Sequence, residues 1–399
     1  MRTTMLGEPV EERRREMAHQ VAAMVGVGVR TRAVLEATPR HLLVPGRSVQ
    51  DAYGQRPIVV KADEGKVVCS TTEPAVQAQL LELAQIGLGQ RVLLVGAAPG
   101  ITAAMTEQLV GPRGQVVALE TDPDLARRTQ LALVATGYHR THLVMGDATS
   151  EHPFRDGEFD RIVATGSLAG IPAWWWRWLR PGGRLVVPLR VHGHCRIIAF
   201  VHEGDRLVGE DWISSEVPAL RWPDQPGGGV DHMVPLGGGC TLHLGHQQSE
   251  MAPVALAAAA DPGPVRWSRV TIPAVRCLDD LALTLARDGA AIGRVTGPGP
   301  GPAGTGSPAL VDSGRLAVVV YRPAPGPAST AGPRWQLGTA AYGGGEGLAP
   351  DLLTWAGAWA ARPHHRPVFH AYPAGTSPGR MSPGTPLADL PGARLQLTR

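Results

Sequence analysis

The sequence of 399 residues is poor in lysine, in cysteine and in net charge. Lys61 and Lys66 are its only lysines, and a formal net charge of +3 is too small to favour nucleic acid or an anionic membrane by bulk electrostatics. The four cysteines lie far apart and form no Cys-x-x-Cys pair, so neither a zinc site nor a redox centre is indicated. We therefore expect no nucleic acid, no membrane and no metal among the partners.

Long apolar runs are missing as well. No stretch is long enough to cross a bilayer, and the charged opening MRTTMLGEPVEERRREM has no apolar core of the kind found in signal peptides. With unpaired cysteines, this predicts a cytoplasmic protein. Glycine and proline are abundant instead, with 50 and 36 residues, and they concentrate in the second half, which should be rich in loops.

Apolar strands alternate with amphipathic helices through the middle of the chain. Helical spacing over 9–38 comes first, and five strand patterns follow, together with a hairpin over 194–212. This alternation predicts an α/β fold with a doubly wound, mostly parallel, Rossmann-like sheet of seven strands, with ligands at the carboxyl ends of the strands. The five strand patterns cover residues 91–96, 114–120, 141–147, 159–166 and 182–190.

The alternation ends near residue 220, where RWPDQPGGGVDHM has the composition of a domain boundary. We expect a first domain over 1–220, in which 1–75 supply N-terminal helices and a substrate segment. A C-terminal α+β accessory domain should then occupy 221–399, with a flexible Gly/Pro-rich insert at 296–308.

Three successive strands end in residues suited to one ligand. Gly96 and Gly100 flank the turn in RVLLVGAAPGITAA, and Glu120 ends the second strand, where a carboxylate can accept hydrogen bonds from ribose hydroxyls. Asp147 ends the third strand and could accept from an adenine amino group, while the N–H of Ala148 donates to the ring. Each feature alone also fits an ordinary turn or a solvated strand end. Together they indicate an adenosine-containing ligand.

Two common adenosine ligands are disfavoured by the same loop. It has neither the G-x-G-x-x-G spacing of dinucleotide sites nor the G-K-[ST] lysine of ATP sites. S-adenosyl-L-methionine needs no phosphate cradle, and it is the cofactor we predict.

Eight motifs follow one another in chain order over about residues 30–200: ATPRHLLVP, AYGQRPI, STTEP, VLLVGAAPG, VVALETDPDLARR, GYHRTHLVMGDA, FDRIVATGSLAGIP and LRPGGRLVVPL. Together they resemble the protein-L-isoaspartate O-methyltransferases. A longer branch from peptide natural-product clusters, the FxLD-type methyltransferases, is also similar, through IPAWWWRWLRPGGRLVVPLRVHGHCRIIAF, VDSGRLAVVVYR and FHAYPAGT. An ordered set of motifs is far more specific than any one of them.

This resemblance implies transfer of a methyl group from S-adenosyl-L-methionine to an aspartate carboxylate of a ribosomal precursor peptide, often one already cyclised as a lanthipeptide or graspetide. The ester would then close to a succinimide and open to isoaspartate. It places Ser70, Thr71 and Thr72 near the methyl-transfer site, although helix capping is an alternative role for these hydroxyls. The cofactor-binding residues that we expect are Gly96, Ala97, Ala98, Gly100, Glu120, Thr121, Asp147, Ala148 and Thr165.

Four residues depart from the family pattern near the expected methionine end of the cofactor: Leu94, Ala98, Pro99 and Ile101. If position 98 needs a positive φ, alanine there costs roughly 1 kcal/mol. Two other functions therefore stay open. One is a repair methyltransferase acting on isoaspartyl proteins, and the other is a degenerate, non-catalytic peptide-binding subunit.

A tryptophan cluster and a histidine cluster each have a structural and a functional interpretation. The four indoles of Trp174–Trp176 and Trp178 cannot all face one side of a helix, so they should pack against the second domain or form a peptide surface. His364, His365 and His370 fit no zinc spacing well, and no metal site is predicted there.

Overall fold

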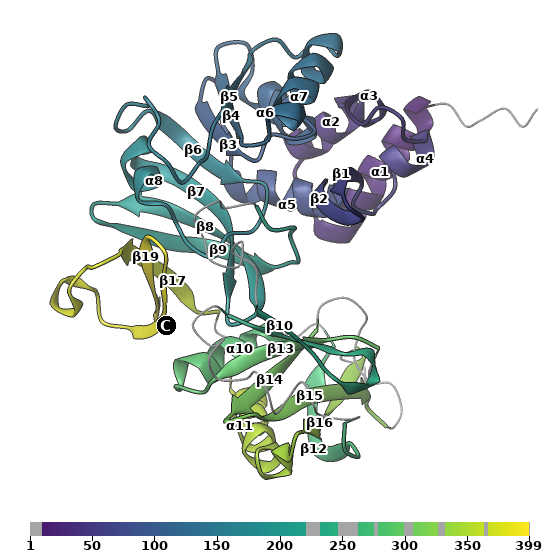
Figure 1. Ribbon diagram of the computed structural model, residues 1–399, viewed down its shortest axis with the longest axis vertical. Helices are drawn as coiled ribbons and strands as arrows, with labels where there is room; N and C mark the ends of the chain where they lie inside the picture. The colour runs from purple at the N-terminus through teal and green to yellow at the C-terminus, as the bar shows by residue number, and fades with distance from the viewer. Residues whose placement is uncertain are drawn as a thin grey trace, which may run out of the picture.

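Two sheets organise the molecule, which we describe from a computed structural model. The upper body in Figure 1 is built on a ten-stranded sheet and the lower body on a seven-stranded sheet. The structure describes residues 10–220, 232–245, 262–274, 278–298, 306–325, 332–362 and 366–398.

The ten-stranded sheet has the order β18-β19-β17-β9-β8-β7-β6-β3-β4-β5. Strands β3 to β7 pair in parallel and the remaining pairs are antiparallel, which confirms the α/β alternation and the hairpin expected from the sequence. The expected number of seven strands is wrong, because β17, β18 and β19 extend the edge at β9. The bounds are β3 (Arg91–Val95), β4 (Gln115–Glu120), β5 (Thr141–Met145), β6 (Phe159–Ala164), β7 (Leu179–Val191), β8 (His194–Glu203), β9 (Arg206–Ser214), β17 (Val368–Pro373), β18 (Thr385–Leu390) and β19 (Ala393–Thr398).

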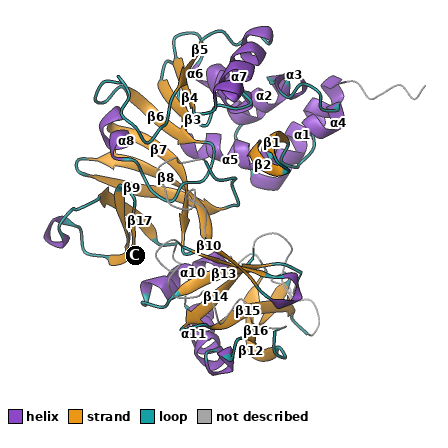
Figure 2. Cartoon of the chain, viewed as in Figure 1, coloured by secondary structure: helices purple, strands orange, loops and turns teal. Residues whose placement is uncertain are grey.

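Alternate residues of the parallel strands enter two separate cores. Val92 and Leu94 face the core that holds α1, α2, α5 and α6, whereas Leu93 and Val95 face the core that holds α8. Figure 2 shows most helices of the upper body gathered on one side of its sheet. The helices of this body and its small hairpin are α1 (Val10–Val25), α2 (Val29–Ala37), α3 (Arg40–Leu43), α4 (Val49–Ala52), β1 (Val59–Asp63), β2 (Lys66–Ser70), α5 (Pro74–Ala84), α6 (Ile101–Val110), α7 (Pro123–Ala135) and α8 (Ala173–Trp178).

The end of the chain returns to the first sheet. Strand β17 pairs with β9 through His370–Val208 and Ala371–Leu207, and it lies beside β9 in Figure 1. Phe369 is 1% exposed and packs in the same core as the parallel strands. The expectation of one accessory domain over 221–399 is therefore wrong for its last part, because buried apolar residues of 368–398 complete the first core.

The seven-stranded sheet is antiparallel throughout, with the order β10-β11-β13-β14-β15-β16-β12. Helices α10 and α11 cover one face, so this body has an α+β arrangement. Residues 299–305 of the insert expected at 296–308 lie outside the described residues. The bounds are β10 (His232–Pro235), β11 (Thr241–Leu244), β12 (Arg266–Pro273), α10 (Leu278–Arg287), β13 (Ile292–Thr296), β14 (Ser307–Asp312), β15 (Arg315–Pro323), β16 (Arg334–Tyr342) and α11 (Ala349–Ala361).

The tryptophan cluster packs on the first sheet. Trp175 and Trp178 are 1% and 2% exposed, and Trp174 and Trp176 are half-buried against the same core. This core also contains Phe369, Leu395 and Leu397 of the last strands, and Leu283 of α10. The tryptophans therefore share a core with residues of the expected second domain, as the sequence predicted, and most of these residues belong to the returning C-terminal strands.

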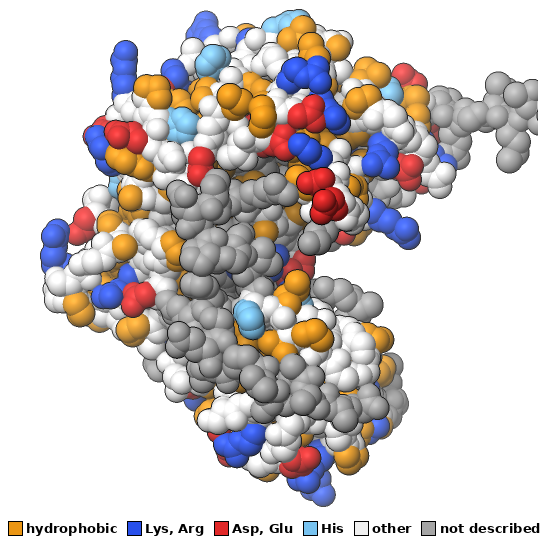
Figure 3. Space-filling view, viewed as in Figure 1, with side chains coloured by type: hydrophobic (Ala, Val, Ile, Leu, Met, Phe, Trp, Pro, Cys, Tyr) orange, Lys and Arg blue, Asp and Glu red, His pale blue; other side chains and the backbone are white. Residues whose placement is uncertain are grey.

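Charged side chains on the visible face, helix length and metal-ligating side chains can each be compared with the sequence expectations. Figure 3 shows cationic and anionic side chains interspersed over the face in view. The helices within the described ranges are all too short or too polar to cross a membrane. His364 and His365 lie outside the described residues, and elsewhere in the described chain no three His, Cys, Asp or Glu side chains are grouped to hold a metal ion.

Candidate active site

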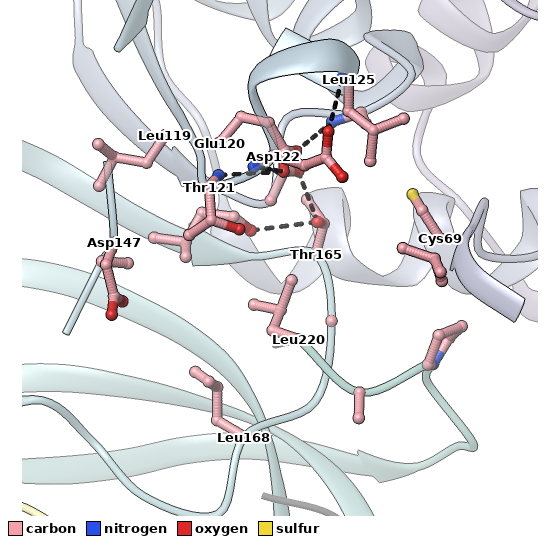
Figure 4. A pocket seen from close by; sticks show the side chains of 18 of the residues that line it. Cys69, Leu119, Glu120, Thr121, Asp122, Leu125, Asp147, Thr165, Leu168 and Leu220 are labelled. Atoms are coloured by element: carbon pink, nitrogen blue, oxygen red, sulfur yellow. Dashed lines mark hydrogen bonds between the residues drawn. The ribbon is translucent and has the colours of Figure 1, made fainter. Parts of the chain in front are cut away.

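A cavity of about 720 Å³ opens at the carboxyl ends of β3, β4, β5 and β6. The chain runs from β3 to β4 and β5 on one side, and then crosses to β6 and β7 on the other, so the cavity lies where the strand order reverses. Its volume is in the range of small-molecule sites, which run from about 300 to 1,000 Å³. Figure 4 shows the lining side chains converging from these strand ends.

The loop after β3 makes one wall of this cavity. Gly96 has φ +88° and Gly100, the N-cap of α6, has φ +102°, so both positions require the left-handed conformation. Gly96 and Ala98 line the cavity, whereas Ala97 and Gly100 are buried behind it. Of these four expected cofactor residues, two face the ligand space and two shape the turn.

The departures from the family pattern do not share one location. Ala98 lines the cavity without a positive φ, so the expected backbone strain is absent there. Leu94 and Ile101 are fully buried in the helix-side core, and Pro99 is buried outside the cavity lining. Of the four residues that depart from the family pattern, only Ala98 therefore lines the cavity.

Glu120, at the end of β4, is held by backbone donors. One carboxylate oxygen accepts the N–H of Ala98 at 3.1 Å, and the other accepts the N–H groups of Thr121 and Asp122 at 3.1 and 3.2 Å. Glu120 is 8% exposed and lines the cavity together with Thr121. Each carboxylate oxygen can accept about two hydrogen bonds, so the oxygen bound to Ala98 keeps capacity for a ribose hydroxyl.

Asp147 and Ala148, after β5, also line the cavity. The Oδ1 of Asp147 accepts the N–H of Thr149 at 2.8 Å, and the described residues give Oδ2 no protein partner. The indole N–H of Trp175 donates to the carbonyl of Ala148 at 2.8 Å, and a ring nitrogen of His152 lies 2.8 Å from the carbonyl of Asp147. The backbone carbonyls of Asp147 and Ala148 are thus held by His152 and Trp175. The carboxylate oxygen Oδ2 of Asp147 stays available to a donor such as an amino group.

Thr165 follows β6 and joins two strand ends. Its hydroxyl donates to the carbonyl of Gly96 at 2.7 Å, and its side chain lines the cavity as expected. A Cβ placed on Gly96 would come within 2.5 Å of this hydroxyl. Position 96 therefore needs glycine for two reasons, the positive φ and the close approach of Thr165.

The three expected hydroxyls near the methyl-transfer site have different surroundings. Ser70 lines the cavity, but Thr71 and Thr72 do not. The hydroxyl of Thr71 accepts the N–H of Ile58 at 2.9 Å, and that of Thr72 donates to the carbonyl of Thr165 at 3.3 Å. The N-cap of α5 is Glu73, without any side-chain cap, so the alternative role of helix capping is wrong.

Several lining residues were missed by reasoning from the sequence. They include Cys69 and Leu220, both labelled in Figure 4, and Trp175, which had been considered for packing or for a peptide surface. The β1–β2 hairpin and the chain after β9 reach the cavity only through tertiary contacts, so no local motif could have identified them. The missed lining residues are Val67, Val68, Cys69, Val95, Leu119, Asp122, Pro123, Leu125, Gly146, Thr149, Gly166, Leu168, Trp175, Pro218, Ala219 and Leu220.

An ion pair connects the β1–β2 hairpin to this site. The ammonium of Lys61 lies 2.5 Å from the carboxylate of Asp122, which also caps α7 through the N–H groups of Asp124 and Leu125. Burial alone raises the pKa of Asp122, but these donors outweigh burial, and its pKa lies below the ordinary value. The ionised carboxylate therefore holds the hairpin wall against the loop after β4.

Comparison with known proteins identifies the family. Residues 15–215 match the model of the protein-L-isoaspartate(D-aspartate) O-methyltransferase (PCMT) family. The chain belongs to this family. Protein-L-isoaspartate O-methyltransferase 2 of Archaeoglobus fulgidus is 28% identical over 211 residues, which are 53% of this chain and 94% of that protein. The protein of the same name from Anaeromyxobacter sp. is 35% identical over 209 residues, which are 52% of this chain and 81% of that protein.

Solved structures of the same class resemble the chain at low identity. A protein-L-isoaspartate O-methyltransferase superposes over 89% of this chain and 96% of its own, with a TM-score of 0.49 and 18% identity. A PCMT from Plasmodium falciparum, in complex with S-adenosyl-L-homocysteine, covers 52% of this chain and 98% of its own, with a TM-score of 0.46 and 12% identity.

PCMT membership makes the chain a protein carboxyl O-methyltransferase with S-adenosyl-L-methionine as methyl donor. The cavity fits that cofactor in its donor and acceptor groups. Glu120 and Asp147 offer carboxylate oxygens for hydroxyl and amino donors, and the cavity has room for one nucleoside with an amino-acid arm.

Proposed function

We propose that this PCMT-family enzyme methylates the side-chain carboxylate of an aspartate in a ribosomal precursor peptide, which then closes to a succinimide and opens to isoaspartate. The observation that carries the proposal is the meeting of Gly96, Glu120 and Asp147 around one cavity at the reversal of strand order. The family supplies the reaction class, and the additional walls of the cavity support a dedicated acceptor.

Two groups of cavity residues should bind the two ends of the cofactor. We expect Glu120 to bind the ribose hydroxyls, and Asp147 and the N–H of Ala148 to bind the adenine edge. The methionine end would then lie along Gly96 and Ala98, on the side of the cavity toward Ser70. S-adenosyl-L-methionine supplies an electrophilic methyl group on its sulfonium sulfur.

Methylation of a carboxylate requires positioning more than proton transfer. The acceptor oxygen forms a bond to the methyl carbon while the carbon–sulfur bond breaks, and the bonding electrons stay on sulfur. A carboxylate is already ionised at neutral pH, so no general base is needed. The protein contributes in-line placement and exclusion of water, to which the apolar lining of Val68, Leu168 and Leu220 is suited.

The product ester explains the later steps without further catalytic groups. The nitrogen of the following peptide bond attacks the ester carbonyl, loses its proton, and methanol leaves, which closes the succinimide. Water then opens the ring at either carbonyl, and opening at the former backbone carbonyl gives isoaspartate.

A repair function on isoaspartyl proteins is the second candidate. The names of the matched relatives favour this function. These relatives are shorter than the present chain, since 53% of the chain covers 94% of the Archaeoglobus protein. A repair enzyme must admit many unrelated segments. The additional antiparallel body and the wall formed by residues 218–220 favour one dedicated peptide instead.

Two measurements test the proposal in sequence. Calorimetry with S-adenosyl-L-homocysteine should show binding, and no heat at millimolar ligand would overturn the enzymatic function. The protein is then incubated with S-adenosyl-L-methionine and three acceptors: the peptide product of a neighbouring precursor gene, a synthetic isoaspartyl peptide, and its aspartyl twin. We expect a mass gain of one methyl group, or the loss of one water, on the precursor. Modification of the isoaspartyl peptide alone would establish the repair function.

A further inference from the structure

The chain after β9 forms a strap over the cavity, which we define as residues 217–220. The N–H of Ser167 donates to the carbonyl of Pro218 at 2.8 Å, and the N–H of Leu220 donates back to the carbonyl of Ser167 at 2.9 Å. The hydroxyl of Ser167 donates to the carbonyl of Val217 at 2.9 Å. The strap is therefore hydrogen-bonded alongside the segment that follows β6, and it lies outside the residues 15–215 matched by the family.

The strap contacts the glycine loop of the cofactor site. A Cβ on Gly96 would come within 2.8 Å of a methyl carbon of Leu220, and a Cβ on Gly166 would come within 2.6 Å of its Cγ. Pro218, Ala219 and Leu220 all line the cavity. Val67, Val68, Cys69 and Ser70 of strand β2 line the same cavity, so the strap and β2 form two of its walls.

Glu216, directly before the strap, pairs with two arginines, of which Arg294 is buried and Arg190 is partly buried. One carboxylate oxygen lies 2.6 Å from Arg294, whose side chain is 3% exposed, and the other lies 3.4 Å from Arg190, which is 11% exposed. Arg190 also donates to the carbonyl of Val217 at 3.0 Å and to the hydroxyl of Ser167 at 2.8 Å. Buried guanidinium groups require an anionic partner, so Glu216 is a strong anchor for the start of the strap.

Arg294 connects this anchor to the second body of the molecule. It belongs to β13 of the seven-stranded sheet, and it also donates to the carbonyl of Gly193, in the turn between β7 and β8, at 2.7 Å. The same turn is packed closely, since a Cβ on Gly193 would come within 2.2 Å of the carbonyl of His243. A side chain of the seven-stranded sheet therefore reaches both the first sheet and the acid that precedes the strap.

We propose that Glu216 is a positioning residue through which Arg294 of the second body holds the strap against Gly96 and sets the width of the acceptor entrance between the strap and β2. The proposal rests on the proposed function for the identity of the acceptor, a peptide carboxylate. It assigns to the antiparallel body a role in selecting that acceptor. The adenosine end of the cofactor, at Glu120 and Asp147, is bound by groups that do not depend on the strap.

The test compares Glu216→Gln with a matched control, Glu210→Gln, in the full-length protein. Glu210 is also a half-exposed acid paired with a buried arginine of β7, Arg184, but it lies on β9 away from the strap. Hydrogen–deuterium exchange is read at the amides of Ser167 and Leu220, with Arg294→Met as a second variant that breaks the anchor from the other side. Binding of S-adenosyl-L-homocysteine and the acceptor KM and kcat are measured in parallel.

We expect Glu216→Gln and Arg294→Met to speed exchange at both amides by roughly tenfold, the effect of losing one charge-assisted hydrogen bond, while Glu210→Gln leaves them unchanged. The acceptor KM should rise about tenfold with kcat and cofactor affinity nearly constant, and Glu216→Asp should restore part of the loss. Equal exchange rates at the amides of Ser167 and Leu220 in Glu216→Gln and Glu210→Gln would show that Glu216 does not anchor the strap. Faster exchange with an unchanged acceptor KM would overturn the selective role. Absence of methyl transfer by the wild type would count against the proposed function, whereas the exchange data still decide the anchoring.

Discussion

The carboxylate of Glu120 accepts the N–H of Ala98 at 3.1 Å, so the end of β4 holds the loop that follows β3. The same carboxylate faces the cavity with the capacity to bind a cofactor hydroxyl. One side chain thus holds the glycine loop and also lines the cavity.

Replacing Glu120 by Gln should weaken cofactor binding. The amide nitrogen cannot accept a hydrogen bond, so the variant loses acceptor positions for a ribose hydroxyl or for a backbone N–H. We expect affinity for S-adenosyl-L-homocysteine to fall by at least about tenfold, and the free energy of unfolding to fall by about 1–3 kcal/mol. Glu82→Gln is the control, because Glu82 accepts the N–H of Gly28 at 2.9 Å outside the cavity lining. Calorimetry showing the same affinity in both variants would contradict a role in binding.

Asp147 should contribute to adenosine binding beyond its role in the local turn. Asp147→Ala removes both the acceptor of the Thr149 N–H and the oxygen that faces the cavity. Asp147→Asn keeps one acceptor for that turn and removes the charge. We expect affinity for S-adenosyl-L-homocysteine to fall about tenfold or more in the alanine variant and by a smaller factor in the asparagine variant, read by calorimetry. Unchanged affinity in the alanine variant would remove the adenosine assignment.

Ala98→Gly should raise cofactor affinity while lowering stability. The change removes the one departing side chain that meets the ligand space, and it keeps the N–H that Glu120 binds. Glycine adds entropy to the unfolded chain, so the free energy of unfolding should fall by about 0.5–1 kcal/mol. Ala97→Gly is the matched control, because Ala97 is 3% exposed and does not line the cavity. An equal gain or no gain of affinity in both variants would show that the methyl group of Ala98 is harmless.

The pair of Lys61 and Asp122 should make stability depend on pH in the acid range. The pKa of Asp122 is depressed in the folded state, so its contribution is present above the ordinary carboxyl pKa of about 4 and is lost as pH falls through the folded-state value. Lys61→Met should therefore lower the free energy of unfolding at neutral pH, by up to about 1 kcal/mol for a partly exposed pair, and the difference from wild type should shrink below about pH 4.

Urea unfolding at several pH values measures this dependence. Arg128→Met is the control. Arg128 pairs with Asp124 within α7, and both of these side chains are more exposed than Lys61 and Asp122. A Lys61→Met difference that stays constant from neutral to acid pH would show that the ion pair does not contribute through the charge of Asp122.

Seven of the nine residues that the sequence suggested for cofactor binding line the cavity, and their role in binding stays a prediction. Gly96, Glu120 and Asp147 each end a parallel strand, and parallel strands bring their carboxyl ends to one edge, so the meeting of these residues follows from chain order and periodicity. The hydroxyls of Thr71 and Thr72 do not line the cavity, because they are engaged by the N–H of Ile58 and the carbonyl of Thr165, and their role in methyl transfer stays a prediction.

What the sequence by itself determined is the local framework: the alternation of apolar strands and helices, the glycines that permit the turns, and the acids at the strand ends. These are properties of period and backbone conformation, which neighbouring residues decide. Only the tertiary structure decided that residues 368–398 complete the first sheet, that the β1–β2 hairpin and the strap wall the cavity, and that Arg294 reaches Glu216. Those relationships join segments distant in sequence through burial and charge pairing, and no local pattern encodes which partner an edge strand or a buried arginine will find.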